Sequence, residues 1–184
     1  MMLELSVRTM SVEEYLAYEQ KGEIRHEYVN GYVYALAEGS SRHNRISLTI
    51  ASHFLELVQG KPCRVYQEGM KLRTFEGVFY YPDVMVVCDK PEPDPFYETE
   101  SCVLVEVLSP STKNTDLREE LTVYKSLPSM QTYLIVDAER LAVRHISKGG
   151  SGRWQQEDLT GAGDIPLPCP GGVLSLPQIY RGVF

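Results

Sequence analysis

The centre of this sequence holds two short, valine-rich apolar runs. They cover residues 80–87 and 103–108, and Pro, Asp or Ser residues bound them. β-Branched side chains fit a pleated surface, and turn-forming residues end such runs after a few positions. The pattern therefore predicts two buried strands that neighbour each other in a sheet.

Other segments predict further strands around these two. Asn30-Gly31 lies between tyrosine- and valine-rich stretches and predicts a hairpin, because both residues tolerate positive φ. Residues 63–73 predict one strand, in which a bulge at Gly69 would change the phase. Residues 132–137 predict a buried strand, and the alternating residues 141–146 predict its hairpin partner.

Helical signals separate these strands. Ser11 and Glu14 form the pattern of a capping box before a helix over residues 12–19. Residues 42–58 carry apolar side chains at helical spacing, and a third helix is expected after Thr115, which suits an N-cap. Strands and helices together predict an α/β (α+β) fold, with residues 1–184 forming a single domain.

Composition narrows the class of protein. The 184 residues suffice for one domain with a core, and the net charge of −7 argues against a broad basic face for nucleic acid. No apolar run approaches the roughly 20 residues that span a bilayer, and the N-terminus lacks a signal pattern. We therefore expect a cytoplasmic protein with no membrane partner. Four scattered cysteines form no CxxC motif, so we expect packed, reduced thiols and no zinc knuckle.

Each central run carries a carboxylate that packing does not explain. Asp83 opens the first strand, and Glu106 lies inside the second with apolar neighbours on both sides. A buried, unpaired carboxylate costs several kcal/mol or becomes protonated, so such residues are paired or bind a metal. A salt bridge to a basic residue is one alternative. The other is a Mg²⁺ site, since Mg²⁺ prefers one or two carboxylates together with waters and phosphates.

These residues also carry a family resemblance. Pro82-Asp83 followed by Glu106-x-Leu108 resembles the core motif of PD-(D/E)XK nucleases. Residues 105–112, followed by Asp116 and Tyr124, are similar to the Uma-type restriction-endonuclease-like family, and the similarity runs from about residue 11 to residue 137. The resemblance implies a restriction-endonuclease-like core in which helices flank a central mixed β-sheet.

The resemblance also implies a function and a site. It implies a metal-dependent endonuclease that hydrolyses DNA phosphodiester bonds, in which Asp83, Glu106 and the Val107 carbonyl hold Mg²⁺ or Mn²⁺. Glu27 matches an acidic position of the family site, and the alternative is a solvated strand residue. His43 matches a histidine that the family often has near the site entrance, and the alternative is a structural role.

One expected residue is missing. PD-(D/E)XK enzymes place a lysine two residues after the second acid, but that position is Leu108. The Uma-type family resembles a variant whose lysine lies on the following helix, and the matching position here is Glu120. Lys71 or Gln67 from the preceding strand is a candidate replacement. Glu120 itself either enters the site and recruits a second metal or is an ordinary exposed helix residue.

Two alternatives to the nuclease hypothesis stay open. The first is a catalytically inactive member of the same fold that acts as a nucleic-acid or protein interaction module. The acidic charge and Glu120 favour it. The second is a two-carboxylate glycosidase, which only the presence of acids supports. Apolar residues in the terminal strands, together with family analogy, suggest a homodimer.

Overall fold

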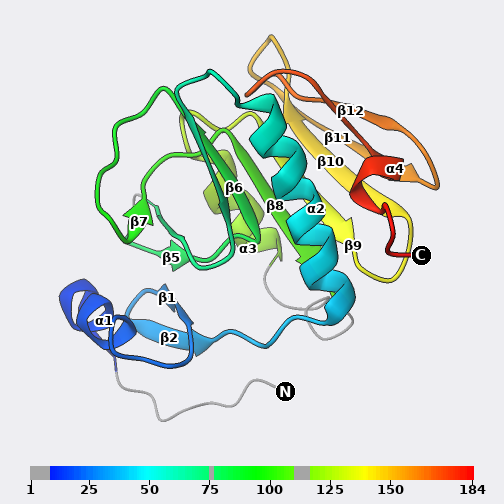
Figure 1. Ribbon diagram of the computed structural model, residues 1–184. Helices are drawn as coiled ribbons and strands as arrows, with labels where there is room; N and C mark the ends of the chain where they lie inside the picture. The colour runs from blue at the N-terminus through cyan, green and yellow to red at the C-terminus, as the bar shows by residue number, and fades with distance from the viewer. Residues whose placement is uncertain (1–8, 75–76, 110–116) are drawn as a thin grey trace.

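The structure is a computed structural model that describes residues 9–74, 77–109 and 117–184. Its framework is a mixed sheet which, in the described residues, has six strands in the order β11-β10-β9-β8-β6-β3 (Figure 1). The β8 and β9 strands are parallel, and the other neighbouring pairs are antiparallel. The strands are β3 (Cys63–Gln67), β6 (Val84–Cys88), β8 (Val103–Leu108), β9 (Thr132–Asp137), β10 (Ala142–Lys148) and β11 (Trp154–Thr160).

A smaller sheet adjoins the first. In the described residues it has five strands in the order β2-β1-β5-β4-β7. The predicted hairpin is present, since β1 and β2 pair around Asn30 and Gly31, whose φ angles are 51° and 93°. The strands are β1 (His26–Val29), β2 (Tyr32–Ala35), β4 (Lys71–Arg73), β5 (Phe79–Tyr80) and β7 (Tyr97–Glu98). The glycine- and proline-rich end adds the short pair β12 (Asp164–Pro166) and β13 (Val173–Ser175).

Helices cover both faces of the six-stranded sheet. The α2 helix (Ser41–Leu57) buries Ile46, Ile50 and Phe54 on one face, where α4 (Leu176–Ile179) also packs (Figure 1). On the opposite face, α3 (Leu117–Lys125) places Tyr124 in a second core cluster. The prediction of a mixed sheet flanked by helices is therefore confirmed. The predicted cap Thr115 lies outside the described residues.

Helix α1 (Val12–Glu19) packs against the smaller sheet. Its predicted capping box is present, because Ser11 accepts from the Glu14 amide and the Glu14 carboxylate accepts from the Ser11 amide. Tyr15 packs between Tyr28 and Phe79 and forms the core of this part of the molecule. Figure 1 shows α1, β1 and β2 together beneath the larger sheet.

Two predicted strands are each divided between the two sheets. The segment 63–73 is broken at Glu68 and Gly69, whose φ angles are 51° and 78°, so β3 joins the larger sheet and β4 the smaller one. The segment 80–87 is likewise divided at Tyr81-Pro82-Asp83. The two crossings are adjacent, since the Glu68 amide donates to the Asp83 carbonyl oxygen at 3.0 Å. Periodicity alone carried no information about a change of sheet.

The expectation of reduced thiols is wrong for this structure. Cys63 bonds to Cys88 with an S–S distance of 2.04 Å, and Cys102 bonds to Cys169 at 2.07 Å. Antiparallel pairing places Cys63 directly opposite Cys88, and the chain returns Cys169 to the start of β8. Spacing along the sequence did not reveal these approaches.

Candidate active site

The carboxylate of Asp83 is held at the crossing between the two sheets. Its Oδ2 atom accepts a hydrogen bond from the Val107 amide at 2.6 Å, which ties it to the strand that carries Glu106. Its Oδ1 atom lies 3.1 Å from Nε2 of His43. The first predicted acid therefore contacts the backbone next to the second one. The Val107 group that contacts Asp83 is its N–H, whereas the family resemblance implies a metal-binding role for its carbonyl.

Glu106 faces the α3 side of the sheet. Its neighbours Val105 and Val107 belong to the core cluster on the α2 side, and the Tyr124 hydroxyl donates to Glu106 Oε1 at 3.3 Å. Burial and then the carboxylates of Asp83, Glu120 and Glu27 raise the pKa of Glu106 well above its ordinary value. The Tyr124 hydrogen bond lowers the pKa and is outweighed.

Carboxylates from separate elements thus converge on Glu106. Glu27 comes from β1, and its Oε1 atom accepts from the Tyr81 amide at 3.4 Å. Glu120 comes from α3, is partly exposed and is close enough to raise the pKa of Glu106. The structure therefore brings together the four acids predicted for the site, namely Glu27, Asp83, Glu106 and Glu120.

His43 is placed by the first turn of α2. The Ser40 side chain caps the helix and accepts from the His43 amide at 3.1 Å. The imidazole lies between two carboxylates, since Nε2 meets Asp83 and Nδ1 is 3.9 Å from Oε1 of Glu68. The hydrogen bond to Asp83 raises the pKa of His43, and burial opposes the shift without cancelling it. The protonated imidazolium is therefore favoured beside Asp83.

Glu68 is a site residue that sequence reasoning missed. It lies in the left-handed region next to Gly69, and this turn directs its carboxylate towards His43. Ligand atoms of His43, Glu68 and Asp83 lie within 4.8 Å of one another. The Glu68-Gly69 pair was a turn signal inside a strand pattern, but a turn signal does not predict which way the side chain points.

Gln67 and Lys71, the two candidate replacements for the family lysine, contact residues outside the group of four acids. Gln67 donates to the Ser47 hydroxyl at 3.1 Å, which places it beside Glu68 on the α2 side. The Lys71 ammonium lies 5.4 Å from the centre of the Tyr81 ring. Burial lowers the pKa of Lys71, and the nearby carboxylates that oppose this shift are Glu19 and Asp94.

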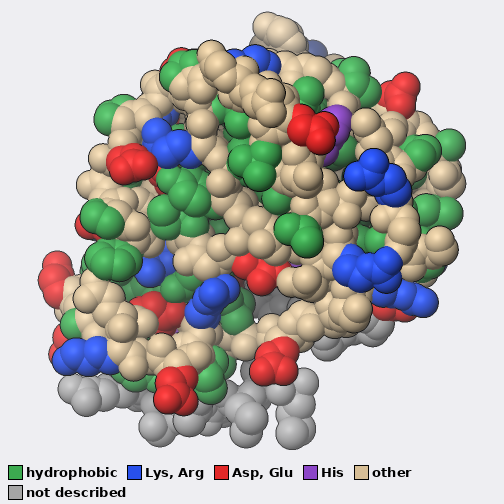
Figure 2. Space-filling view, viewed as in Figure 1, with side chains coloured by type: hydrophobic (Ala, Val, Ile, Leu, Met, Phe, Trp, Pro, Cys, Tyr) green, Lys and Arg blue, Asp and Glu red, His purple; other side chains and the backbone are tan. Residues whose placement is uncertain are grey.

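The donor set suits a hard divalent cation. Carboxylate oxygens dominate it, and after burial the charges of Asp83, Glu120 and Glu27 contribute to the raised pKa of Glu106. A cation would relieve this repulsion. Figure 2 shows acidic and basic side chains interspersed over the face that carries α2.

The comparisons with known proteins support a nuclease-like α+β fold. The chain belongs to the Uma2 family, described as "Putative restriction endonuclease", whose family model matches residues 12–176. Two Synechocystis proteins, both described as uncharacterized, are related to it. One, slr1290, is 31% identical over 95% of this chain and 93% of its own length, and the other, sll1609, is 28% identical over 88% and 93%.

A solved structure shares the fold. It is described as a putative nuclease belonging to DUF820 from Anabaena variabilis, and it superposes with a TM-score of 0.77 over 95% of this chain and 99% of its own. The sequences are 17% identical, so this likeness concerns the fold alone. Among the described helices, none is long and apolar enough to span a membrane.

Proposed function

We propose that this chain is a Mg²⁺- or Mn²⁺-dependent endonuclease that hydrolyses phosphodiester bonds of DNA. The observation that supports the proposal best is the meeting of acids from β1, the β5–β6 crossing, β8 and α3 around Glu106. Packing does not require such an arrangement, because each acid raises the free-energy cost of ionising the next. The family description of a restriction endonuclease agrees with it.

Asp83 and Glu106 are the proposed metal ligands, with the Val107 carbonyl beside them. A bound divalent cation would lower the pKa of a water molecule and balance the negative charge of the phosphate. The Val107 amide fixes the Asp83 carboxylate, and the Tyr124 hydroxyl orients Glu106. Glu27 and Glu120 add negative charge that would favour a second cation.

His43 is the proposed source of positive charge in place of the family lysine. Its pKa is raised, so it keeps a proton more readily than a free imidazole does. A proton on Nε2 is donated to Asp83 Oδ1. Gln67 and Lys71 remain candidate contributors, but the described contacts of Lys71 are with Tyr81 and the surroundings of Glu19.

The inactive interaction module is the second candidate. Glu120 favours it, since a carboxylate occupies the position at which the family places its catalytic cation, and it adds to the repulsion at Glu106. A protein of this kind would keep the fold and lose hydrolysis.

Mn²⁺ calorimetry followed by cleavage of plasmid and single-stranded DNA tests the proposal. We expect wild type to bind Mn²⁺ and cut DNA, and Asp83→Asn and Glu106→Gln to lose both activities while remaining folded. Glu56→Gln, an exposed acid on α2, is the matched control and should behave as wild type. The enzyme hypothesis fails if wild type binds no divalent ion and Asp83→Asn changes nothing.

Glu120→Lys separates the two candidates. Cleavage that rises in this variant, from a wild type that binds Mn²⁺ but cuts poorly, would mean that the site is complete except for one cation. A variant that remains inactive despite normal Mn²⁺ binding would favour the interaction module.

A further inference from the structure

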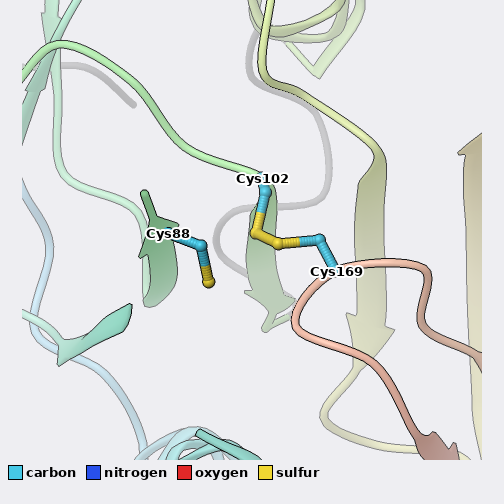
Figure 3. A group of neighbouring side chains, drawn as sticks. All are labelled: Cys88, Cys102 and Cys169. Atoms are coloured by element: carbon cyan, nitrogen blue, oxygen red, sulfur yellow. A yellow bond between two sulfur atoms is a disulfide. The ribbon is translucent and has the colours of Figure 1, made fainter. Parts of the chain in front are cut away.

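All four cysteines gather at one end of the six-stranded sheet. Cys63 begins β3, Cys88 ends β6, and Cys102 directly precedes β8. Cys169 lies in the loop between β12 and β13, which folds back onto this end of the sheet. The Sγ atoms of Cys88, Cys102 and Cys169 lie within 4.8 Å of one another (Figure 3). The fourth sulfur, that of Cys63, is bonded to Cys88.

This sulfur cluster is separate from the acidic site. The strands β6 and β8 run antiparallel, so the end that carries Cys88 and Cys102 is opposite to the end near Asp83. Cys88 lies five positions after Asp83 along extended chain, which corresponds to about 16 Å. A ligand bound at the sulfurs would therefore not touch the carboxylates.

The spacing of the sulfurs matches what a thiolate metal site needs. Zinc binds four thiolates tetrahedrally at about 2.3 Å, which places the sulfurs about 3.8 Å apart. The sulfurs of Cys88, Cys102 and Cys169 already lie close to this spacing, since all three are within 4.8 Å of one another.

The surroundings also suit a negatively charged zinc–thiolate centre. The Lys61 ammonium donates to the carbonyl oxygen of Pro170, the residue after Cys169, at 2.8 Å. It therefore carries a positive charge beside the loop that bears one ligand. Cys102 is buried and anchors the cluster, whereas Cys63, Cys88 and Cys169 are partly exposed and can be reached by a reductant and an ion.

We propose that the four cysteines form one redox-linked zinc site. In the oxidised chain they are the two disulfides that the structure contains. An external dithiol delivers two electrons and two protons to each disulfide and leaves as its own disulfide. The four thiols then release four protons as their sulfurs bind one Zn²⁺ ion. Two molecules of a small disulfide oxidant reverse the change: each takes two electrons from a thiolate pair and two protons from solvent, leaves as a dithiol, and the re-formed protein disulfides release the Zn²⁺ ion.

Cobalt binding to the reduced wild-type chain tests the proposal. The protein is reduced with dithiothreitol, freed of reductant by gel filtration without oxygen, and titrated with Co²⁺ and then Zn²⁺. We expect one Co²⁺ per chain to give intense thiolate-to-cobalt charge-transfer absorption, one Zn²⁺ to abolish it, and no such absorption in the unreduced protein. Circular dichroism of the zinc-loaded chain should match that of the oxidised chain.

Two variants locate the ion. Asp83→Asn should keep the charge-transfer absorption, because the acidic site does not contribute to it. Cys102→Ser should lose it. Absence of the absorption from reduced wild type overturns the proposal whether or not the chain stays folded, and an absorption that Asp83→Asn abolishes would place the ion elsewhere. Neither result bears on DNA cleavage.

Discussion

The observed position of the His43 imidazole requires a glycine at residue 39. A Cβ atom on Gly39 would lie 2.6 Å from Nδ1 of His43, closer than such atoms approach in folded proteins. The Gly39→Ala variant must therefore push the ring away from Asp83. We expect the pKa of His43 to fall, because the hydrogen bond that raises it is lost while burial still lowers it. Imidazole NMR titration measures this shift.

The matched control for that change is Gly150→Ala. No atom lies within 4 Å of a Cβ built at Gly150, so its effect should be small. Weaker Mn²⁺ binding in Gly39→Ala than in Gly150→Ala would tie the ring position to the site. An unchanged His43 titration in Gly39→Ala would mean that the ring adapts without leaving Asp83.

Glu106 should make the metal-free chain less stable as pH rises. Its pKa is raised in the fold, so the folded chain holds this proton when the unfolded chain has lost it. Stability from this group is complete below the ordinary value of 4.5 and is lost as pH rises through the raised value. Urea unfolding of Glu106→Gln in EDTA should therefore show a smaller loss between pH 5 and pH 8 than wild type.

Added Mn²⁺ provides the control for this pH effect. A cation at the carboxylates should restore stability to wild type at the higher pH and do little for Glu106→Gln. Parallel pH curves for the two proteins without metal would contradict the assigned role of Glu106.

Some site residues could be read from the sequence and others could not. Asp83 and Glu106 stood out because a charged side chain in a valine-rich run needs an explanation. His43 and Glu27 came from family resemblance. Glu68 could not be predicted, since its direction depends on a left-handed turn that only the three-dimensional course of the chain reveals.

At the level of secondary-structure elements, the N-cap of helix α2 both stabilises the helix and positions a site residue. Its Ser40 cap holds the amide of His43, and removal of such a cap costs about 1 kcal/mol. Ser11→Ala removes the corresponding cap of α1 and is the matched control. We expect both variants to lose similar stability in urea unfolding and Ser40→Ala alone to bind Mn²⁺ more weakly. Equal Mn²⁺ binding would mean that tertiary packing fixes His43 without the cap.

The strand predictions were sound in kind and wrong in extent. Valine-rich periodicity located β6 and β8 well, because buried strands select the same side chains wherever they lie. It could not show that residues 63–73 and 80–87 each pass from one sheet to the other. A change of sheet leaves the alternation of side chains intact and alters only a few backbone angles.

At the scale of the whole molecule, the disulfides should stabilise the chain unequally. Cys102 and Cys169 are 67 residues apart, whereas Cys63 and Cys88 are 25 apart. Loop-closure entropy makes the longer link worth about 1 kcal/mol more. We expect Cys102→Ser/Cys169→Ser to lose more stability than Cys63→Ser/Cys88→Ser in non-reducing urea unfolding. The reverse order would mean that local packing of the sulfurs outweighs chain entropy.

The clustering of the four cysteines is a property of the whole molecule that composition could not predict. The mixed sheet followed from the order of strands and helices along the chain, but the meeting of four cysteines depends on the β3–β6 register and on the return of the C-terminal loop. Cysteines without a local motif therefore gave a wrong prediction of isolated thiols.

The paired crossings at Glu68 and Asp83 have a mechanical consequence. The two connections are hydrogen-bonded to each other, and they run from one sheet into the other at the same place. A DNA strand bound there, as the proposed function requires, would lie between the two sheets, with Glu27 on one and Glu106 on the other. A rotation of the smaller sheet relative to the larger one would change the distance between these two carboxylates.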